Sequence, residues 1–221
     1  MTCGQDQVAR IGRVDAASTR HDPRQTPEVR ILDAFARLVA EHGLAKVNIG
    51  MICARSGYPR SVVYQHIGDK DMLVHQLVEW AKDEFSTAYS AAVANRTGSA
   101  TATPMDMLRA LLDVFFELMT DLPALFQAFI TLWADAVAET SPARPVMTEP
   151  DRRYRFAIAQ TVAAGIADGS LEATTDPDAY ASALLGQLRG ISMQVLIDPD
   201  GVDLPGVRAE LERALTRMAA R

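Results

Sequence analysis

Apolar side chains recur at helical spacing along most of the chain from residue 26 onward, and no stretch alternates apolar and polar residues as a strand does. A first helix is predicted to begin after Thr26, because this threonine cap is followed by a proline and a glutamate. Ile31 and Phe35 lie on its apolar face, and Gly43 is placed to end it. The pattern therefore predicts an all-α protein.

Two short helices and one long helix are predicted next. Asn48 is a cap for the first short helix, Gly57 ends it, and the second covers about residues 59–66. Asp69 then caps a long helix that should reach about Val93. Small polar residues at 95–103 form a loop, and helices are expected beyond it at 104–120, from 123 to a break at 141–145, and at 150–168, 176–197 and 204–220.

The composition is that of a globular protein, with 48% hydrophobic and 23% charged residues in a chain of 221. Cys3 and Cys53 cannot form a disulfide framework, and the chain shows neither a signal-peptide-like segment nor an apolar window of about 18 residues. We therefore expect a cytoplasmic protein with no membrane partner. No histidine pair has metal-ligand spacing, and Gly201 occupies the wrong position for a calcium loop. We expect no metal, no cofactor and no catalytic residues, so the chain is not predicted to be an enzyme.

The charge is distributed unevenly along the chain. The net charge is −6, but residues 1–68 hold nine Lys and Arg against six Asp and Glu, so that this part carries +3 and the rest −9. A cationic front and an anionic rear suit a protein that meets a polyanion with one end. Chance clustering of charges is the alternative.

The two short helices form the pattern of a helix-turn-helix, in which the second helix enters the major groove of DNA. At the exposed start of that helix, Arg60 can pair with the O6 and N7 atoms of guanine. Tyr64 offers a hydroxyl to a phosphate, and Lys70 lies in the first turn of the next helix. The pattern alone also arises by accident in helical bundles, where Tyr64 would be a core residue and Lys70 a solvated charge.

The sequence around this motif resembles the TetR family of bacterial transcriptional regulators. Its spacing matches without a gap over residues 29–74 at Ile31-Leu32-Asp33-Ala34, Gly43, Ile52, Gly57, Val63-Tyr64, His66 and Lys70. The chain departs from the family pattern at Asn48, Cys53, Tyr58-Pro59 and Ile67, where Thr, Ala, Val-Ser and Phe are usual. The change at Tyr58-Pro59, in the turn, is expected to alter which operator sequence is recognised.

The resemblance implies roles for individual residues. Arg60 and Ser61 would face base edges, with added contacts from Tyr58 or Val62. Asn48, Tyr64, His66 and Lys70 would hold the sugar-phosphate backbone. Residues 1–26 would be a flexible basic arm whose Arg20 and Arg24 reach a flanking groove, residues 27–85 the DNA-binding domain, and residues 86–221 a helical ligand-binding and dimerisation domain.

The C-terminal half carries weaker indications. The run from Ala183 to Asp203 is similar to the branch of the family that includes the choline-responsive repressor, although the ligand is not carried over with it. A pocket is predicted among Phe116, Met119, Phe129 and Trp133, with a hydrophobic or amphipathic ligand, and a cation stacked on Trp133 is one option. Ordinary core packing is the alternative for these aromatic residues. The predicted dimer interface comprises Ala183, Gly186, Gly190, Leu211 and Met218.

The sequence thus predicts a homodimeric regulator that binds double-stranded operator DNA, a repressor released by a small-molecule effector. Two alternatives remain open. One is a DNA-binding regulator without a small ligand. The other is a helical enzyme or carrier that happens to have a three-helix head.

Overall fold

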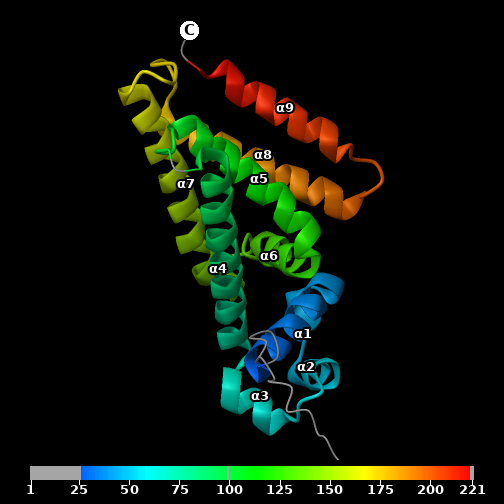
Figure 1. The fold of residues 1–221 in the computed structure, drawn as a ribbon. Helices are drawn as coiled ribbons and strands as arrows, with labels where there is room; N and C mark the ends of the chain where they lie inside the picture. The colour runs from blue at the N-terminus through cyan, green and yellow to red at the C-terminus, as the bar shows by residue number, and fades with distance from the viewer. Residues whose placement is uncertain (1–25, 99, 220–221) are drawn as a thin grey trace, which may run out of the picture.

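The computed structural model describes residues 26–98 and 100–219 and confirms the all-α fold (Figure 1). Within these ranges, the only pairing of strand type is an isolated bridge between Leu171 and Ala219. The predicted arm, with Arg20 and Arg24, lies outside the described residues. The helices of the described part are α1 (Pro27–His42), the 3-10 turn η2 (Leu44–Lys46), α2 (Ile49–Ser56), α3 (Arg60–Ile67), α4 (Lys70–Thr97), α5 (Pro104–Asp121), α6 (Pro123–Asp135), α7 (Ala143–Ala167), α8 (Pro177–Ile197) and α9 (Leu204–Arg217).

Helices α1, α2 and α3 form a small head at one end of an elongated molecule, and α4 runs from this head to the helices at the other end (Figure 1). The predicted caps are present in the head. The Asn48 side chain accepts a hydrogen bond from the Met51 amide at 3.1 Å, and Asp69 accepts one from the Met72 amide at 3.0 Å. These bonds satisfy free amides in the first turns of α2 and α4, and thereby fix where each helix begins.

Gly57 makes the sharp turn between α2 and α3. It lies in the left-handed region with φ 78°, and its amide donates to the Cys53 carbonyl at 3.0 Å. A β-carbon in this conformation would be strained, although nothing lies within 4 Å of its position.

We therefore expect Gly57→Ala to lower the free energy of unfolding by about 1–2 kcal/mol, because a left-handed alanine is strained by about that amount. Gly57→Asn should lose less, since asparagine tolerates this conformation. Urea titration followed by circular dichroism measures both variants. Equal stability of Gly57→Ala and the parent would contradict the assigned turn.

Two helices are longer than predicted. Helix α4 continues to Thr97, so the predicted domain boundary at residues 85 and 86 falls inside a continuous helix. Helix α7 begins at Ala143 and not at residue 150, and the predicted break at 141–145 is wrong in extent. Pro145 lies in the first turn of α7, where a missing amide hydrogen leaves no bond unmade, and the Ser141 hydroxyl accepts from the Ala143 amide at 3.0 Å.

The core of the head extends beyond the head itself. The cluster built on Ile31, Phe35 and Ile52, which are all fully buried, also includes Leu125 and Leu132 of α6. A second cluster joins α5, α7, α8 and α9 at the other end. Helix α6 also contacts α5, α7 and α8, so it connects the head core to the helices of the other end.

No single helix of the described part is long and apolar enough to cross a membrane. By length and composition alone, α5 and α6 pass such a test as a pair, bent by 110° at their junction.

Candidate DNA-binding surface and ligand cavity

Helix α3 presents an exposed face beside the Gly57 turn. Arg60 and Ser61 are exposed in its first turn, and Tyr64, one turn further on, is 51% exposed. Val63 and Ile67 on the opposite face are buried in the head core. Tyr64 is thus not a core aromatic residue, and its hydroxyl is available at the surface.

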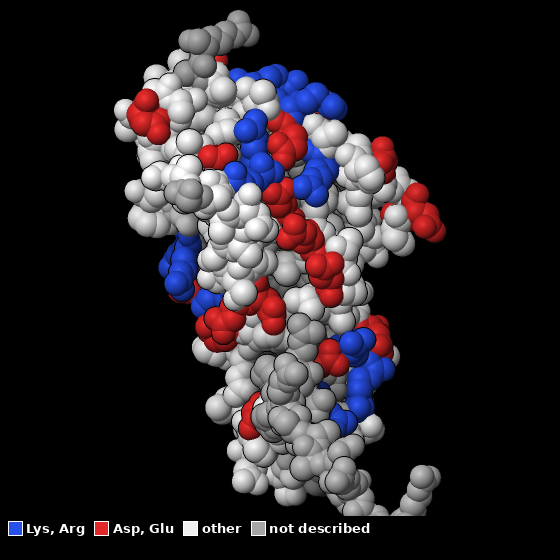
Figure 2. Space-filling model, in the orientation of Figure 1, with Lys and Arg blue, Asp and Glu red and all other residues white. Residues whose placement is uncertain are grey.

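The acidic residues of the described head are all paired. Asp33 accepts from Arg37 at 2.8 Å, Glu41 from Arg55 at 2.5 Å, and Glu28 contacts His66. Within the described part of the chain, Arg60 and Lys46 form no ion pair, and both are exposed. On the side drawn in Figure 2, basic side chains lie over α1 and α2 with acidic ones beside them, a second basic group lies over α9, and acidic side chains follow α5.

Several predicted DNA-contact residues also have partners inside the head. The Lys70 ammonium donates to the Leu44 carbonyl at 2.7 Å, and the His66 ring bonds to Glu28 at the start of α1. The Tyr58 ring lies beneath the Arg30 guanidinium, 5.3 Å from its centroid. These contacts fix the orientation of α3 and α4 relative to α1.

Lys46 is a candidate phosphate contact that was not predicted from the sequence. It ends η2, two residues before the Asn48 cap of α2, and therefore lies close in the chain to the N-terminus of that helix. An exposed lysine at this place is suited to a phosphate. It lies within the aligned range 29–74 but at none of the positions that define the family pattern, so the motif gave no reason to single it out.

A cavity of about 780 Å³ lies between α4, α5, α6, α7 and α8. Its wall is mainly apolar and aromatic, as in most small-molecule sites. The aromatic residues of the wall are Phe85, Tyr89, Phe115, Phe126, Phe129, Trp133 and Tyr154.

Of the four residues predicted for the pocket, Phe129 and Trp133 line this cavity, and Phe116 and Met119 do not. Helix α5 turns Phe115 and Leu118 toward the cavity. The Phe116 ring instead lies 5.7 Å from the Arg208 guanidinium of α9. Both adjacent phenylalanines fit an apolar pattern, so the sequence could not show which one faces the cavity.

Two largely buried cations lie in the cavity wall: Lys82, which is 18% exposed and pairs with Glu79, and Arg189. The Arg189 side chain is 16% exposed, and its guanidinium stacks on Trp133 at 3.5 Å from the ring centroid. Burial lowers the pKa of Arg189 from its usual range despite the nearby Asp151. Burial also raises the pKa of Tyr154 to about 12, so its hydroxyl stays protonated at neutral pH. Neither residue was singled out in the sequence.

The predicted interface residues fall into two groups. Ala183, Gly186 and Gly190 are exposed along α8, and nothing lies within 4 Å of where a β-carbon would stand on either glycine. Leu211 and Met218 pack against the core of their own subunit instead.

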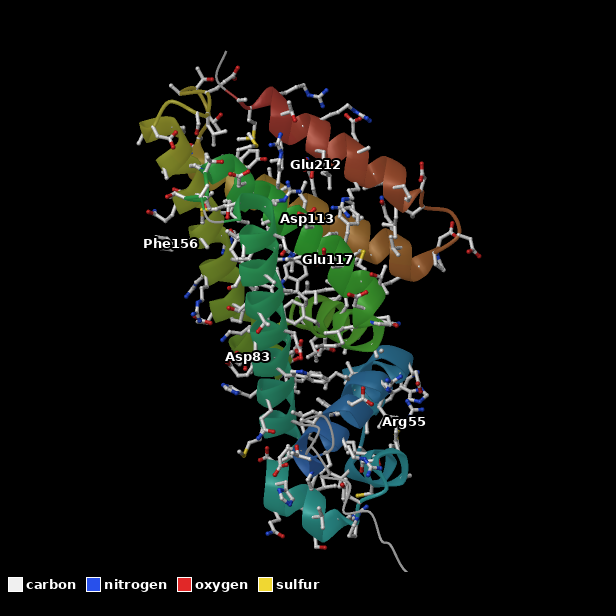
Figure 3. The ribbon with its side chains drawn as sticks, viewed as in Figure 1. Arg55, Asp83, Asp113, Glu117, Phe156 and Glu212 are labelled. Atoms are coloured by element: carbon white, nitrogen blue, oxygen red, sulfur yellow. The ribbon has the colours of Figure 1, made fainter. Side chains whose placement is uncertain are left out.

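An ionic network explains the direction in which α9 faces (Figure 3). Asp113 of α5 binds Arg208 of α9, and it accepts from Arg96 of α4 at 2.6 Å. Glu212 of α9 lies 3.4 Å from Arg109 of α5. These pairs hold the apolar side of α9 on α5, and its outer side is polar. In the described residues, no group of three or more His, Cys, Asp or Glu could hold a metal ion.

Family models match both halves of the chain. The model for bacterial regulatory proteins of the tetR family matches residues 31–77, and the model for the C-terminal domain of BetI-type transcriptional repressors matches residues 104–220. No curated protein matches the chain in sequence.

Solved structures share the fold. A transcriptional regulator from Saccharomonospora viridis in complex with choline is 22% identical, with a TM-score of 0.69, over 88% of this chain and 98% of that one. A TetR-family regulator from a Rhodococcus species is 20% identical, with a TM-score of 0.71, over 88% and 98%. The SmeT–triclosan complex is 23% identical, with a TM-score of 0.74, over 89% and 93%. Together with the two family models, these likenesses show that the chain belongs to the TetR family of bacterial transcriptional regulators.

Proposed function

We propose that this regulator is a homodimeric repressor that binds operator DNA in the cytoplasm and releases it when a small apolar or amphipathic molecule fills the cavity. The observation that carries this proposal is the double role of α6, which lies in the wall of the cavity and in the core of the head. A displacement of α6 caused by a change in the cavity would therefore also displace residues of the head core. No arrangement of side chains in the described residues points to catalysis, so we propose that the chain is not an enzyme.

Residues of α6 serve the two sites. Leu125, Phe129 and Trp133 line the cavity. Leu125 is also buried in the head core with Ala128 and Leu132, and Phe129 and Trp133 pack against that core. The side chain of Gln127 also donates to the Ala40 carbonyl of α1 at 3.2 Å. Displacement of α6 by a ligand would shift α1, and with it the position of α3.

On the DNA side, Arg60 and Ser61 are proposed to read base edges in the major groove, flanked by Tyr58 and Val62. Tyr64 and Lys46 are proposed to bind phosphates, with Asn48 beside them. For His66 and Lys70, the contacts within the head support a second role. They hold α3 and α4 in place and would reach phosphates only by exchanging these partners.

The exposed stripe of α8 is proposed as the dimer interface. Ala183, Gly186, Gly190, Met193 and Ile197 recur at spacings of three and four residues, opposite the buried Leu184 and Leu188. Small residues allow two helices to approach closely, and Ile197, which is 79% exposed, adds an apolar contact. A two-fold axis here would place two α3 helices on half-sites about one helical turn of DNA apart, roughly 34–36 Å.

The identity of the ligand does not follow from the relatives. Choline, triclosan and isovaleryl coenzyme A are named in the structures of similar fold, and these are unrelated in charge and size. The proposal is tested by selecting bound sequences from random duplex DNA with the purified protein, followed by fluorescence anisotropy on the selected site. Binding without sequence preference would overturn the assignment as an operator-binding repressor.

Arg60→Ala is expected to lower affinity for the selected site by about 1–3 kcal/mol and to relax preference at one base position, because a bidentate contact to guanine is lost. Lys46→Ala is the matched control. It should weaken all sequences alike and reduce the salt slope by about one. Titration of specific and scrambled duplexes at several salt concentrations separates the two effects. Unchanged sequence preference in Arg60→Ala would show that α3 is placed wrongly on the DNA.

A further inference from the structure

The buried guanidinium of Arg189 in the cavity wall is a feature that the proposed function leaves unexplained. Arg189 comes from α8, reaches the aromatic wall, and lies against Trp133 of α6. A guanidinium withdrawn from water needs an anion or several hydrogen-bond acceptors nearby. The partners present determine whether it has capacity for a ligand.

The partners of Arg189 leave it incompletely neutralised. Its terminal nitrogen lies 2.5 Å from one oxygen of Asp151, but that oxygen is buried and accepts no hydrogen bond, so the contact lacks good geometry. The other Asp151 oxygen accepts two hydrogen bonds from Arg155, at 2.8 and 3.1 Å. Two arginines thus share one carboxylate, so the three groups together carry a net charge of +1, and Arg189 is the one of the two arginines that lines the cavity.

A neutral donor lines the same cavity. Tyr154 of α7 lines the cavity, and its ring packs edge-on against Phe85 at 5.2 Å. Its buried phenol remains protonated, so it can donate to an anion beside Arg189. Charge-assisted hydrogen bonds from an arginine and a hydroxyl are a strong arrangement for a carboxylate.

The same geometry opposes a cationic ligand. A quaternary ammonium group needs an open aromatic face, but the Arg189 guanidinium already covers Trp133. The lining carboxylates on α4 do not offer a buried anion either. Glu79 binds Lys82 at 2.9 Å, and Asp83 is exposed. Glu84 accepts from the neutral Trp80 indole at 3.0 Å and keeps its negative charge, but it is only half-buried, so the covered face of Trp133 is the main obstacle to a cation. The cation option raised by Trp133 in the sequence is therefore disfavoured.

We propose that the cavity selects an amphipathic carboxylic acid, whose carboxylate binds Arg189 and Tyr154 and whose apolar chain lies among the phenylalanines of α5 and α6. Such an acid would be the effector in the function proposed above, on which this assignment rests. The site is a headgroup site at the junction of α6, α7 and α8. This site selects the charge of the ligand headgroup, and the apolar wall of the cavity binds the rest of the ligand.

Three single-chain probes of equal length test the charge class by calorimetric titration in the absence of DNA: decanoate, decanol and decyltrimethylammonium, each below its micelle concentration. Decanoate should bind the parent protein roughly 10- to 100-fold more tightly than decanol, as expected for hydrogen bonds to a charged group. Decyltrimethylammonium should bind more weakly than decanol. Equal or tighter binding of the alcohol or the ammonium compound would overturn the proposal, and so would failure of all three to bind.

Two variants locate the headgroup. Arg189→Met should bring decanoate down to the affinity of decanol while decanol binding persists, which also shows that the variant folds. Arg153→Met is the matched control, because Arg153 also lines the cavity but its side chain is 66% exposed. It should keep the preference for decanoate, whereas Tyr154→Phe should reduce it several-fold. A preference that survives Arg189→Met or disappears in Arg153→Met would place the anion elsewhere.

The DNA experiments distinguish this failure from a failure of the proposed function. Operator selection does not depend on which ligand fills the cavity. A protein that selects a specific DNA sequence but binds the ammonium probe best would keep its role as a repressor and lose only the headgroup site.

Discussion

Gly186→Trp is expected to convert the dimer into monomers and to lower operator affinity by about 10²- to 10⁴-fold, because the second head then loses the high effective concentration that the first provides. The physical reason is steric. Gly186 is exposed in one subunit, with open space where a β-carbon would stand, so an indole fits the monomer. It does not fit between two α8 helices packed at close distance. Light scattering measures the mass, and anisotropy measures the affinity for the full site.

Val137→Trp is the matched control for this substitution. Val137 follows α6, is 75% exposed, and lies away from the α8 stripe, so the dimer and the operator affinity should both be retained. A Gly186→Trp protein that remains dimeric with unchanged DNA affinity would place the interface elsewhere. The exposed Phe156 of α7 would then be the next surface to test (Figure 3).

The local fold of the head could be read from the sequence because short-range chemistry determines it. Caps such as Asn48 and Asp69, and the turn at Gly57, act within three or four residues of their own position. The same logic failed in α7, which carries Pro145 in its first turn, where a proline is tolerated, and continues through Pro150 in its interior. The distinction depends on where the helix starts, which the apolar pattern around residue 143 does not show.

The cavity was predicted only in part because its wall depends on contacts between distant segments. Which phenylalanine of α5 faces inward is decided by Arg208 of α9, which attracts the Phe116 ring. Leu211 and Met218 of the predicted interface pack against the core of their own subunit for a similar reason. Ionic contacts of Asp113 and Glu212 hold the apolar side of α9 on α5. Long-range ion pairs leave no periodic trace in a sequence.

The expected route from cavity to DNA also changes with the structure. The sequence indicated the long helix, now α4, as a lever, because it begins beside α3 and reaches the ligand domain. The structure adds α6, whose buried residues belong to the head core and whose Gln127 bonds to α1. Helix α7 also reaches both, since Met147 is buried in the head core and Tyr154 lines the cavity. Three helices thus connect the cavity to the head, and the contribution of α6 can be measured separately.

A ligand that releases the operator must bind the DNA-bound protein less tightly by the same factor, because the coupling free energy is shared between the two sites. Its usual size is about 1–3 kcal/mol per site. A dimer has two cavities, so we expect the loss of operator affinity at saturation to be up to about twice that free energy. Calorimetric titration of the ligand into the free protein and into its operator complex measures the factor directly. Identical affinity in both titrations would exclude release by that molecule.

Gln127→Ala tests whether this coupling passes through α6. The substitution removes the hydrogen bond to the Ala40 carbonyl but leaves the cavity wall and the reading face of α3 unchanged, since Gln127 lines neither. Ligand affinity of the free protein should stay within about twofold, while the coupling falls by roughly 0.5–2 kcal/mol, the range for residues that connect two sites. Trp133→Ala gives the complementary pattern, with weaker ligand binding and intact DNA affinity of the free protein. Full coupling in Gln127→Ala would show that the hydrogen bond from α6 to α1 does not carry the transmission.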